Sequence, residues 1–267
     1  MGIFSLRALL KGLKYSASVC ALLLRDHGYF RSVAAGEYRD ETNNYIPWFT
    51  YSAIEALKNW DLSDKRVFEY GSGYSTLFWA SRAKEVISVE HNPQWHQKIA
   101  RLVPANAKVM LAPIDEAKNG YHPSAETSAE LARYTETIND VGGRFQILVI
   151  DGYARSRVRY QCARAALPHL DDNGLVILDN SDWLPATAMF LRQSGLIEVD
   201  LSGPVPGTKN HQTTSFFFTR QFDFKPAELR QPLPPVGGKV MNWETGLEQE
   251  LLESCGQKVR KGIVAGR

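Results

Sequence analysis

A glycine turn with an acidic residue before it is the first feature of the sequence that could do chemistry. Residues 67–70 form a short expected strand that is apolar except for Glu69. A Gly-Ser-Gly turn at 71–73 follows this strand and leads into a helical stretch. Glycine lets the backbone approach a ligand closely, and dinucleotide-binding turns carry a third glycine where this chain has Thr76. Glu69 would repel a pyrophosphate but would suit a ligand with an ammonium group. Alternatively, the turn uses glycine for conformational reasons alone.

A second acidic residue, Glu90, ends the next expected strand. In α/β folds that bind nucleosides, a carboxylate at this position accepts the hydroxyl groups of a ribose. Taken alone, Glu90 could instead be a solvated acid at a strand end. Combined with Glu69 and the turn, it predicts a nucleoside ligand that also has a cationic group.

Two later apolar runs also end in polar side chains. Residues 147–150 lead into Asp151, and residues 175–178 lead into Asp179 and Asn180. Because the carboxyl ends of parallel strands meet at one edge of a sheet, we expect these side chains to lie close together. Their oxygens would suit Mg²⁺, with water and substrate completing the coordination. The alternative is that Asp179 and Asn180 only cap the next helix, since both residue types are preferred caps.

Short apolar runs alternate with helical stretches from residue 67 onward, which predicts an α/β fold. We expect a doubly wound, mostly parallel, seven-stranded Rossmann-like sheet. The last two strands are joined only by a loop at 202–212, so the last strand should be antiparallel. The expected strands are residues 67–70, 86–90, 109–111, 147–150, 175–178, 196–200 and 215–219. The expected helices between them are residues 76–83, 95–102, 157–167 and 185–194.

The turn, Glu69 and Glu90 together resemble the class I S-adenosylmethionine-dependent methyltransferases, over roughly residues 65–220. In that family the acidic residue and the glycine turn hold the methionine part of the cofactor, and the acid after the second strand holds the ribose. Asp115 falls near the position where the family contacts adenine. The cofactor contacts that we assign on this resemblance are Glu69, Gly71, Ser72, Gly73, Thr76, Glu90, Asp115 and Asp151.

The polar ends of the fourth and fifth strands resemble the metal-dependent catechol and caffeoyl-coenzyme A O-methyltransferases. Those enzymes bind Mg²⁺ or Ca²⁺ with an Asp after the fourth strand and an Asp-Asn pair after the fifth. The resemblance implies Asp151, Asp179 and Asn180 as metal ligands. The catechol enzymes have a Lys base shortly after the first Asp, whereas this chain has Arg155, which is always protonated and a poor base. Either the metal alone acidifies the hydroxyl group, or another residue accepts the proton.

The candidates for catalysis are Asp151 and His211, which precedes the last expected strand. His122 is a further candidate base, in a segment at 117–143 that is longer than a simple crossover. Each histidine could instead be a solvated loop residue.

Outside the sheet we expect three additions to the methyltransferase domain at 63–224. They are a helical N-terminal extension at 1–62, an inserted cap at 117–143 and a proline-rich C-terminal arm at 225–267. Trp48 in the extension, together with Tyr51, either forms a wall of the cofactor site or packs in the core.

The first helix is amphipathic, because Arg7, Lys11 and Lys14 share one stripe and the leucines lie on roughly the opposite face. It should pack on its own domain or on a second subunit, or lie on a membrane surface. The chain has 31 basic and 29 acidic residues, a balance that does not favour a nucleic-acid partner. Three separated cysteines indicate neither disulfides nor a zinc site, so we expect a cytoplasmic protein, membrane-associated if this helix binds lipid.

These features predict a methyltransferase that uses S-adenosyl-L-methionine. We expect O-methylation of a small-molecule hydroxyl group, assisted by Mg²⁺ or another divalent cation if the metal site forms. The first alternative is a metal-independent methyltransferase for a sugar, lipid-linked or amino-acid acceptor. A less favoured alternative is a non-catalytic module with a cofactor-binding fold.

Overall fold

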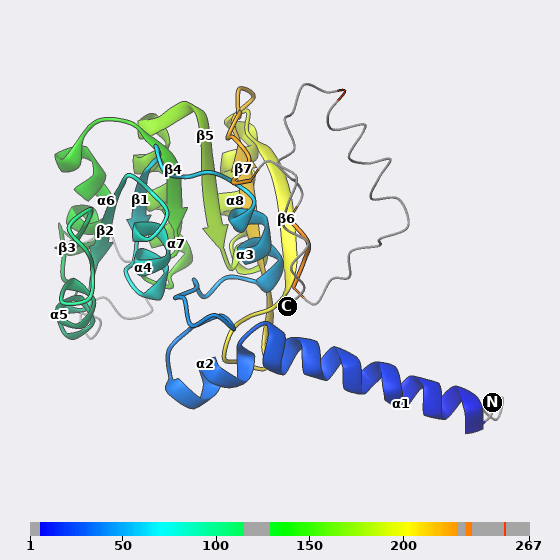
Figure 1. The fold of residues 1–267 in the computed structure, drawn as a ribbon. Coiled ribbons are helices and arrows are strands. Elements are labelled where there is room, and N and C mark those ends of the chain that lie inside the picture. Colours follow the sequence, from blue (N-terminus) through cyan, green and yellow to red (C-terminus); the bar gives the residue numbers. More distant parts are fainter. Residues whose placement is uncertain (1–5, 115–128, 229–232, 237–253, 255–267) are drawn as a thin grey trace.

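A seven-stranded sheet forms the centre of the molecule in the computed structural model, which describes residues 6–114, 129–228, 233–236 and 254. The strand order is β3-β2-β1-β4-β5-β7-β6 (Figure 1). The parallel strands are β1 (Arg66–Tyr70), β2 (Glu85–Glu90), β3 (Ala107–Leu111), β4 (Phe145–Ile150) and β5 (Leu170–Asp179). β7 (His211–Phe218) lies antiparallel between β5 and β6 (Ile197–Pro204). This confirms the predicted fold class, including the reversed last strand.

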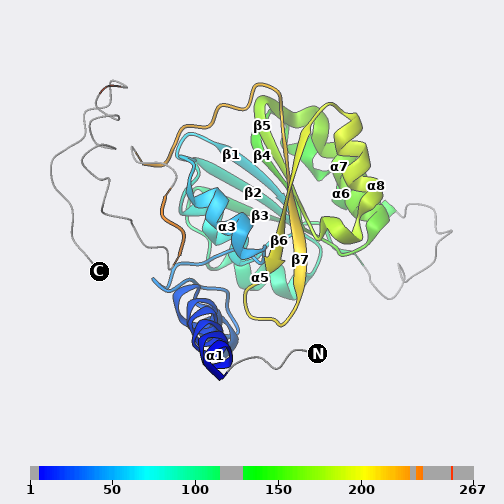
Figure 2. The same ribbon diagram turned by 90° about the vertical axis from the view of Figure 1, so that its right-hand side faces the viewer.

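Helices cover both faces of the sheet, because the central strands are apolar on both sides. One face carries α3 (Tyr51–Lys58), α4 (Tyr74–Ala80) and α5 (Pro93–Ala100) (Figure 2). The other carries α6 (Ala129–Val141), α7 (Ser156–Ala166) and α8 (Pro185–Gln193). Within β4, Ile147 and Val149 face the first layer, whereas Leu148 and Ile150 face the second.

The predicted N-terminal extension is only partly separate from the domain. Residues 36–50 contain no helix, and Phe49 and Ile54 are buried against the sheet. Thr50 caps α3 and also forms hydrogen bonds with β6 and β7. Its N–H donates to Thr214 Oγ1 at 3.2 Å, and its hydroxyl donates to the carbonyl of Leu201 at 2.8 Å. The segment around Thr50 is therefore part of the core, because it covers a sheet face that would otherwise be exposed.

The inserted cap predicted at 117–143 is wrong for the part that the structure describes. Residues 129–141 form α6, the crossover helix between β3 and β4, and its side chains Tyr134 and Ile138 are fully buried in the core. Residues 117–128, with His122, lie outside the described residues. Most of the predicted arm at 225–267 lies outside them as well, so its role stays a prediction.

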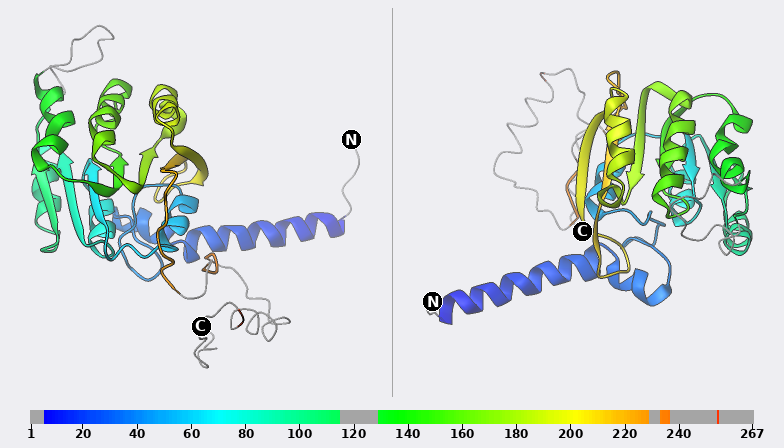
Figure 3. Two further views of the ribbon diagram at one scale, coloured as in Figure 1. Left: turned by 90° about the horizontal axis from the view of Figure 1, so that it is seen from above. Right: turned by 180° about the vertical axis from the view of Figure 1, so that it is seen from behind.

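The N-terminal helices differ from the rest of the molecule in exposure. α1 (Leu6–Ala21) projects from the body, and residues 7–21 are all exposed (Figures 1 and 3). A π-helical turn, η1 (Leu22–Asp26), joins it to α2 (Tyr29–Ala35). No helix within the described ranges is both long and apolar enough to cross a bilayer.

If the segment before α3 belongs to the core, Phe49→Ala should lower the free energy of unfolding by about 3–5 kcal/mol, because a buried aromatic ring is lost and a cavity remains. Urea denaturation followed by circular dichroism measures this. Phe30→Ala is the matched control, since Phe30 is 69% exposed and its loss should change stability by less than about 0.5 kcal/mol. Equal effects of the two substitutions would contradict the placement of Phe49.

Candidate cofactor and catalytic site

The register of the sheet brings the predicted carboxylates to one edge. Tyr70 pairs with Ile150, and Ile150 pairs with Leu178, so the residues that follow these strands lie level with one another. Side chains alternate between the faces of a sheet. Glu69, Asp151 and Asp179 therefore share the face covered by α3 and α4. This edge is where ligands bind in open α/β sheets.

Glu69 is almost fully buried and only partly satisfied. Its Oε2 accepts hydrogen bonds from Thr76 Oγ1 at 2.6 Å and Ser88 Oγ at 2.7 Å. No described group makes a well-oriented hydrogen bond to Oε1, although the Ser75 hydroxyl is close enough to favour the charged form. Burial raises the pKa of Glu69 to about 7, against the effect of these hydroxyl groups. A buried carboxylate oxygen that lacks a well-oriented hydrogen bond fits a ligand that brings an ammonium group.

The two glycines of the turn have different functions. Gly71 has φ +92°, and a Cβ there would lie 2.6 Å from the carbonyl oxygen of Asp151, so only glycine fits against the end of β4. A Cβ at Gly73 would meet no atom closer than 3.9 Å. Gly73 N donates to Thr76 Oγ1 at 3.0 Å, which links the turn to Glu69 through the threonine hydroxyl. A side chain at position 73 would make only ordinary van der Waals contacts, so close packing requires glycine at position 71 and not at position 73.

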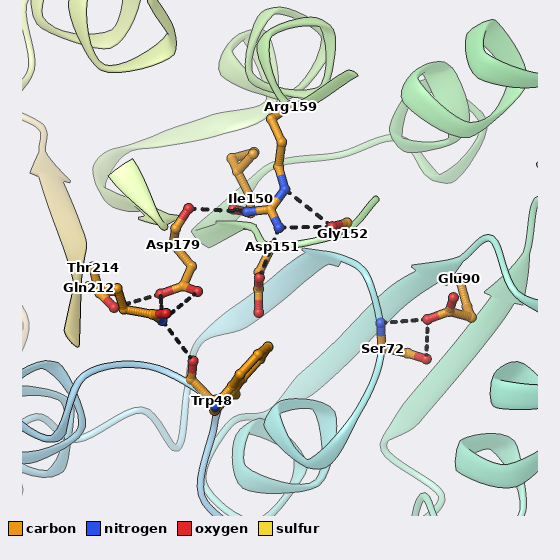
Figure 4. A network of polar contacts seen from close by, with 10 residues as sticks. All are labelled: Trp48, Ser72, Glu90, Ile150, Asp151, Gly152, Arg159, Asp179, Gln212 and Thr214. Carbon is orange, nitrogen blue, oxygen red and sulfur yellow. Dashed lines mark hydrogen bonds and ion pairs between the residues drawn. The ribbon is translucent and has the colours of Figure 1, made fainter. Parts of the chain in front are cut away.

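Glu90 binds the same turn from the end of β2. Its Oε2 accepts hydrogen bonds from Ser72 N at 3.0 Å and Ser72 Oγ at 2.9 Å, while Oε1 accepts from the backbone of His91 and Asn92 (Figure 4). Burial alone would raise the pKa of Glu90, but the hydrogen bonds from His91, Asn92 and Ser72 hold it below its ordinary value. Glu90 is therefore a permanent anion that fixes the turn. Its contact with a ribose stays a prediction.

Arg159 on α7 is the residue of the site that sequence reasoning missed. Its buried guanidinium donates to the carbonyl oxygens of Ile150, Gly152 and Asp179 at 2.9–3.2 Å and to Asp151 Oδ1 at 3.2 Å (Figure 4). These bonds join the ends of β4 and β5. No sequence motif identifies Arg159, because the segment around α7 is rich in arginine and reads as a solvated helix.

The two aspartates beside Arg159 have different surroundings. The side chain of Asp151 is 21% exposed, and burial raises its pKa to about 6 against the opposing charge of Arg159. Asp179 is 1% exposed, and burial and then the nearby charge of Asp151 raise its pKa well above the usual range. Asp179 accepts hydrogen bonds from Thr214 Oγ1 at 2.6 Å and Gln212 Nε2 at 3.2 Å.

These partners do not fit the metal site that the resemblance implied. A guanidinium already neutralises Asp151, and the oxygens of Asp179 are taken by Thr214 and Gln212. Asn180 takes a left-handed backbone conformation, with φ 54°, where β5 leads into a 3₁₀ turn. The described parts of the chain also hold no cluster of three or more His, Cys, Asp and Glu side chains of the kind that binds a metal ion.

Aromatic side chains from the segment before α3 border the same edge. Trp48 is partly exposed, stacks on Tyr38 at 5.7 Å between ring centroids, and donates from Nε1 to the carbonyl of Pro206 at 3.1 Å. The carboxyl group of Asp151 points toward the side on which Trp48 lies, between Asp179 and the Ser72–Glu90 pair (Figure 4). Tyr51, by contrast, is buried within the core. Trp48 thus lies at the site and Tyr51 does not.

The remaining predicted site residues do not join this group. His211 is exposed at the start of β7, where alternation turns it away from the face on which Gln212 and Thr214 contact Asp179. The structure therefore does not support His211 as a base acting beside Asp151. Asp115, predicted near the adenine, lies outside the described residues.

Arg159→Met should lower the free energy of unfolding by about 3–5 kcal/mol, because it leaves Asp151 and three strand-end carbonyl groups without their buried partner. Thermal and urea unfolding measure the loss. Arg164→Met on the exposed side of the same helix is the matched control and should change stability by less than about 0.5 kcal/mol. A stable Arg159→Met protein would show that the strand ends do not depend on the guanidinium.

Comparison with known proteins agrees with this geometry. Residues 68–181 match a family described as a methyltransferase domain. No curated protein matches the chain.

Among solved structures, fibrillarin from Aeropyrum pernix is 15% identical, covers 62% of this chain and 72% of its own, and has a TM-score of 0.47. A precorrin-6y C5,15-methyltransferase from Geobacter metallireducens is 14% identical, with coverages of 63% and 87% and a TM-score of 0.42. A putative methyltransferase from Streptococcus mutans is 12% identical, with coverages of 65% and 99% and a TM-score of 0.42. These similarities are too low to carry the assignment, which rests on the family match, the strand order and the turn between Glu69 and Glu90. The chain therefore carries a class I S-adenosylmethionine-dependent methyltransferase domain.

Proposed function

We propose that the protein methylates a hydroxyl oxygen of a small molecule without a metal ion, and that Asp151 accepts the proton. The observation that carries this proposal is the position of Asp151. It is a partly exposed carboxylate, level with Gly71 on one side and Asp179 on the other, and it is oriented by Arg159. S-Adenosylmethionine supplies a methyl group on a positively charged sulfur, so the protein must align the acceptor and remove its proton.

The environment of Asp151 suits a general base. A base works best when its pKa lies near the working pH, and the pKa of Asp151 is raised to about 6 by burial. Arg159 binds Oδ1, and among the described residues no hydrogen bond reaches Oδ2. Oδ2 is therefore available to the acceptor hydroxyl group. As the new carbon–oxygen bond forms and the carbon–sulfur bond breaks, the hydroxyl proton passes to Asp151, which becomes neutral.

Trp48 and Tyr38 support a cyclic acceptor. Their rings stack nearly parallel, with an interplanar angle of 12°, and Trp48 remains partly exposed. The charge of Asp151 contributes to the raised pKa of Tyr38, after burial and Tyr74, which supports the view that these two rings lie near the proposed base. A flat apolar surface beside a carboxylate favours an acceptor whose hydroxyl group lies on a ring. The ring would pack on Trp48 while the hydroxyl group meets Asp151.

The partners of the two aspartates favour a reaction without a metal. A divalent cation would have to compete with the guanidinium of Arg159 for Asp151 and displace Thr214 and Gln212 from Asp179. Like charges this close repel, so the buried arginine and a bound cation would destabilise each other. The arginine would take the place that a metal holds in the catechol-type enzymes.

Asp151→Asn should lower kcat by at least about a hundredfold, because the amide keeps the size of the side chain but cannot accept the proton. In the unchanged protein, kcat should rise with pH through about 6, as Asp151 loses its proton. Both are measured with methyl-labelled S-adenosylmethionine and a panel of ring hydroxyl compounds, in excess chelator, with the methyl ether identified by NMR.

Asp172→Asn, on an exposed aspartate at the opposite end of β5, is the matched control and should retain full activity. Activity that chelator abolishes and Mg²⁺ restores would overturn the metal-free proposal and favour the metal-assisted alternative. Methylated nitrogen in place of oxygen would overturn the choice of acceptor.

Affinity for S-adenosylhomocysteine should rise several-fold between pH 6 and 7.5, because Glu69, with a pKa of about 7, gains the charge that attracts the ammonium group. Calorimetry measures this, and Glu69→Gln should bind more weakly and lose the pH dependence. In the ligand-free protein, the contribution of Glu69 to the free energy of unfolding changes with pH in the opposite direction. A raised acidic pKa stabilises the fold at low pH, and this contribution is lost as the pH rises through about 7. An unchanged pH profile in Glu69→Gln would assign the effect to another group.

A further inference from the structure

The N-terminal amphipathic segment, residues 6–35, carries a charge unlike that of the rest of the chain. It contains five basic residues and one acidic residue, whereas the whole chain has a net charge of only +2. Within α1 all three charged side chains are basic, at Arg7, Lys11 and Lys14. This concentration of positive charge favours an anionic partner.

The leucine face of α1 has no partner within the described parts of the chain. Leu9, Leu10 and Leu13 are 56%, 58% and 60% exposed, and α1 projects away from the domain (Figures 1 and 3). At 100° per residue these leucines form one arc with Ala17 and Cys20, and the basic stripe lies beside that arc rather than on the opposite face expected from the sequence. A helix with an apolar arc and flanking lysines fits the boundary between lipid headgroups and acyl chains, where the lysine stems reach up to the headgroups.

α2 carries two more exposed apolar side chains and lies against the edge of the sheet at which the parallel strands end. Phe30 and Val33, one turn apart on α2, are 69% and 53% exposed. On its inner side, α2 buries Ser32 against the loop between β6 and β7. A Cβ added at Gly207 in that loop would lie 3.8 Å from Ser32 Cβ. α1 and α2 therefore lie on the side of the molecule where the parallel strands end (Figure 1).

From this charge, exposure and placement we infer that residues 6–35 dock the protein on an anionic lipid bilayer, with the carboxyl edge of the sheet facing the membrane. The leucines and Phe30 insert at the headgroup boundary, and the basic residues bind the anionic headgroups. This inference does not depend on the proposed function, since membrane binding needs neither cofactor nor acceptor.

The protein has a natural attachment site for a probe. Cys20 is exposed on the leucine arc and Cys162 is buried, so a polarity-sensitive fluorophore can be attached to Cys20 once Cys255 is replaced by Ser. Vesicles of phosphatidylcholine with phosphatidylglycerol should shift the emission to the blue, whereas vesicles of phosphatidylcholine alone should not. The same fluorophore at position 18, attached in the double variant Ser18→Cys and Cys20→Ser, should shift little, because position 18 lies within the basic stripe.

Binding to the anionic vesicles, measured by sedimentation, should respond to charge and to the leucines separately. Lys11→Glu should weaken it at least about fivefold, since each basic residue near an anionic surface contributes roughly that factor, and 1 M salt should weaken it in the unchanged protein. Leu13→Gln should weaken it in both salt conditions. The matched controls are Lys108→Glu and Leu102→Gln, exposed positions on and near β3, which should bind as the unchanged protein does.

Thermal unfolding and cofactor affinity should be the same in all these variants, because the substituted side chains are exposed. Three results would overturn the inference. They are no binding to either kind of vesicle, equal binding to anionic and neutral vesicles, and a dimer that Leu13→Gln converts to monomer without any effect on vesicles. The last result would assign the leucine arc to a second copy of the chain.

Discussion

One buried guanidinium holds together the part of the sheet on which the site depends. Arg159 reaches from α7 to the ends of β4 and β5 and satisfies three backbone carbonyl groups and a carboxylate there. Without a cation at this position, Asp151 and Asp179 would face each other across adjacent strands with little water to separate them. The arginine lets two acidic side chains occupy neighbouring strand ends. Its charge also lowers the pKa of both aspartates, against the larger effect of burial.

The acidic residues along this edge divide into two kinds by their surroundings. Glu90 accepts backbone and hydroxyl hydrogen bonds on both oxygens and stays charged, so it can fix the turn at any ordinary pH. Glu69 is buried and Asp151 is partly exposed, and both accept fewer hydrogen bonds than Glu90, so burial raises their pKa values to about 7 and about 6. Groups that titrate near neutral pH at a ligand-binding edge are typical of functional sites. The structure thus separates the acid that fixes the turn from the two acids that titrate near neutral pH.

The fold could be predicted from the sequence because its signals are local. Apolar runs, a glycine turn and an acid at a strand end each lie within a few residues, and the strands around Glu69 and Glu90 formed as expected. Arg159 could not be predicted, because its role depends on which strands end beside α7. The positions of Asp151 and Asp179 after apolar runs predicted that both lie at one edge of the sheet. They could not show which other side chains bind the two aspartates there. His211 could not be excluded from the sequence, because β7 begins at His211 itself, four residues before the start expected from the apolar run.

The link between Thr50 and Thr214 has a consequence for how the chain is made. The two residues are separated by 164 positions, and the cover that Phe49 and its neighbours give the sheet is completed only when β6 and β7 are present. At a synthesis rate of about 5–20 residues per second, the ribosome releases Thr50 on the order of ten to thirty seconds before Thr214. During that interval β6 and β7 are missing, so Trp48 and Phe49 lack the strands and loop beside which they lie in the folded protein. Long-range closure of this kind slows folding and exposes apolar surface to other chains, so the nascent protein should depend on chaperones more than its finished core suggests.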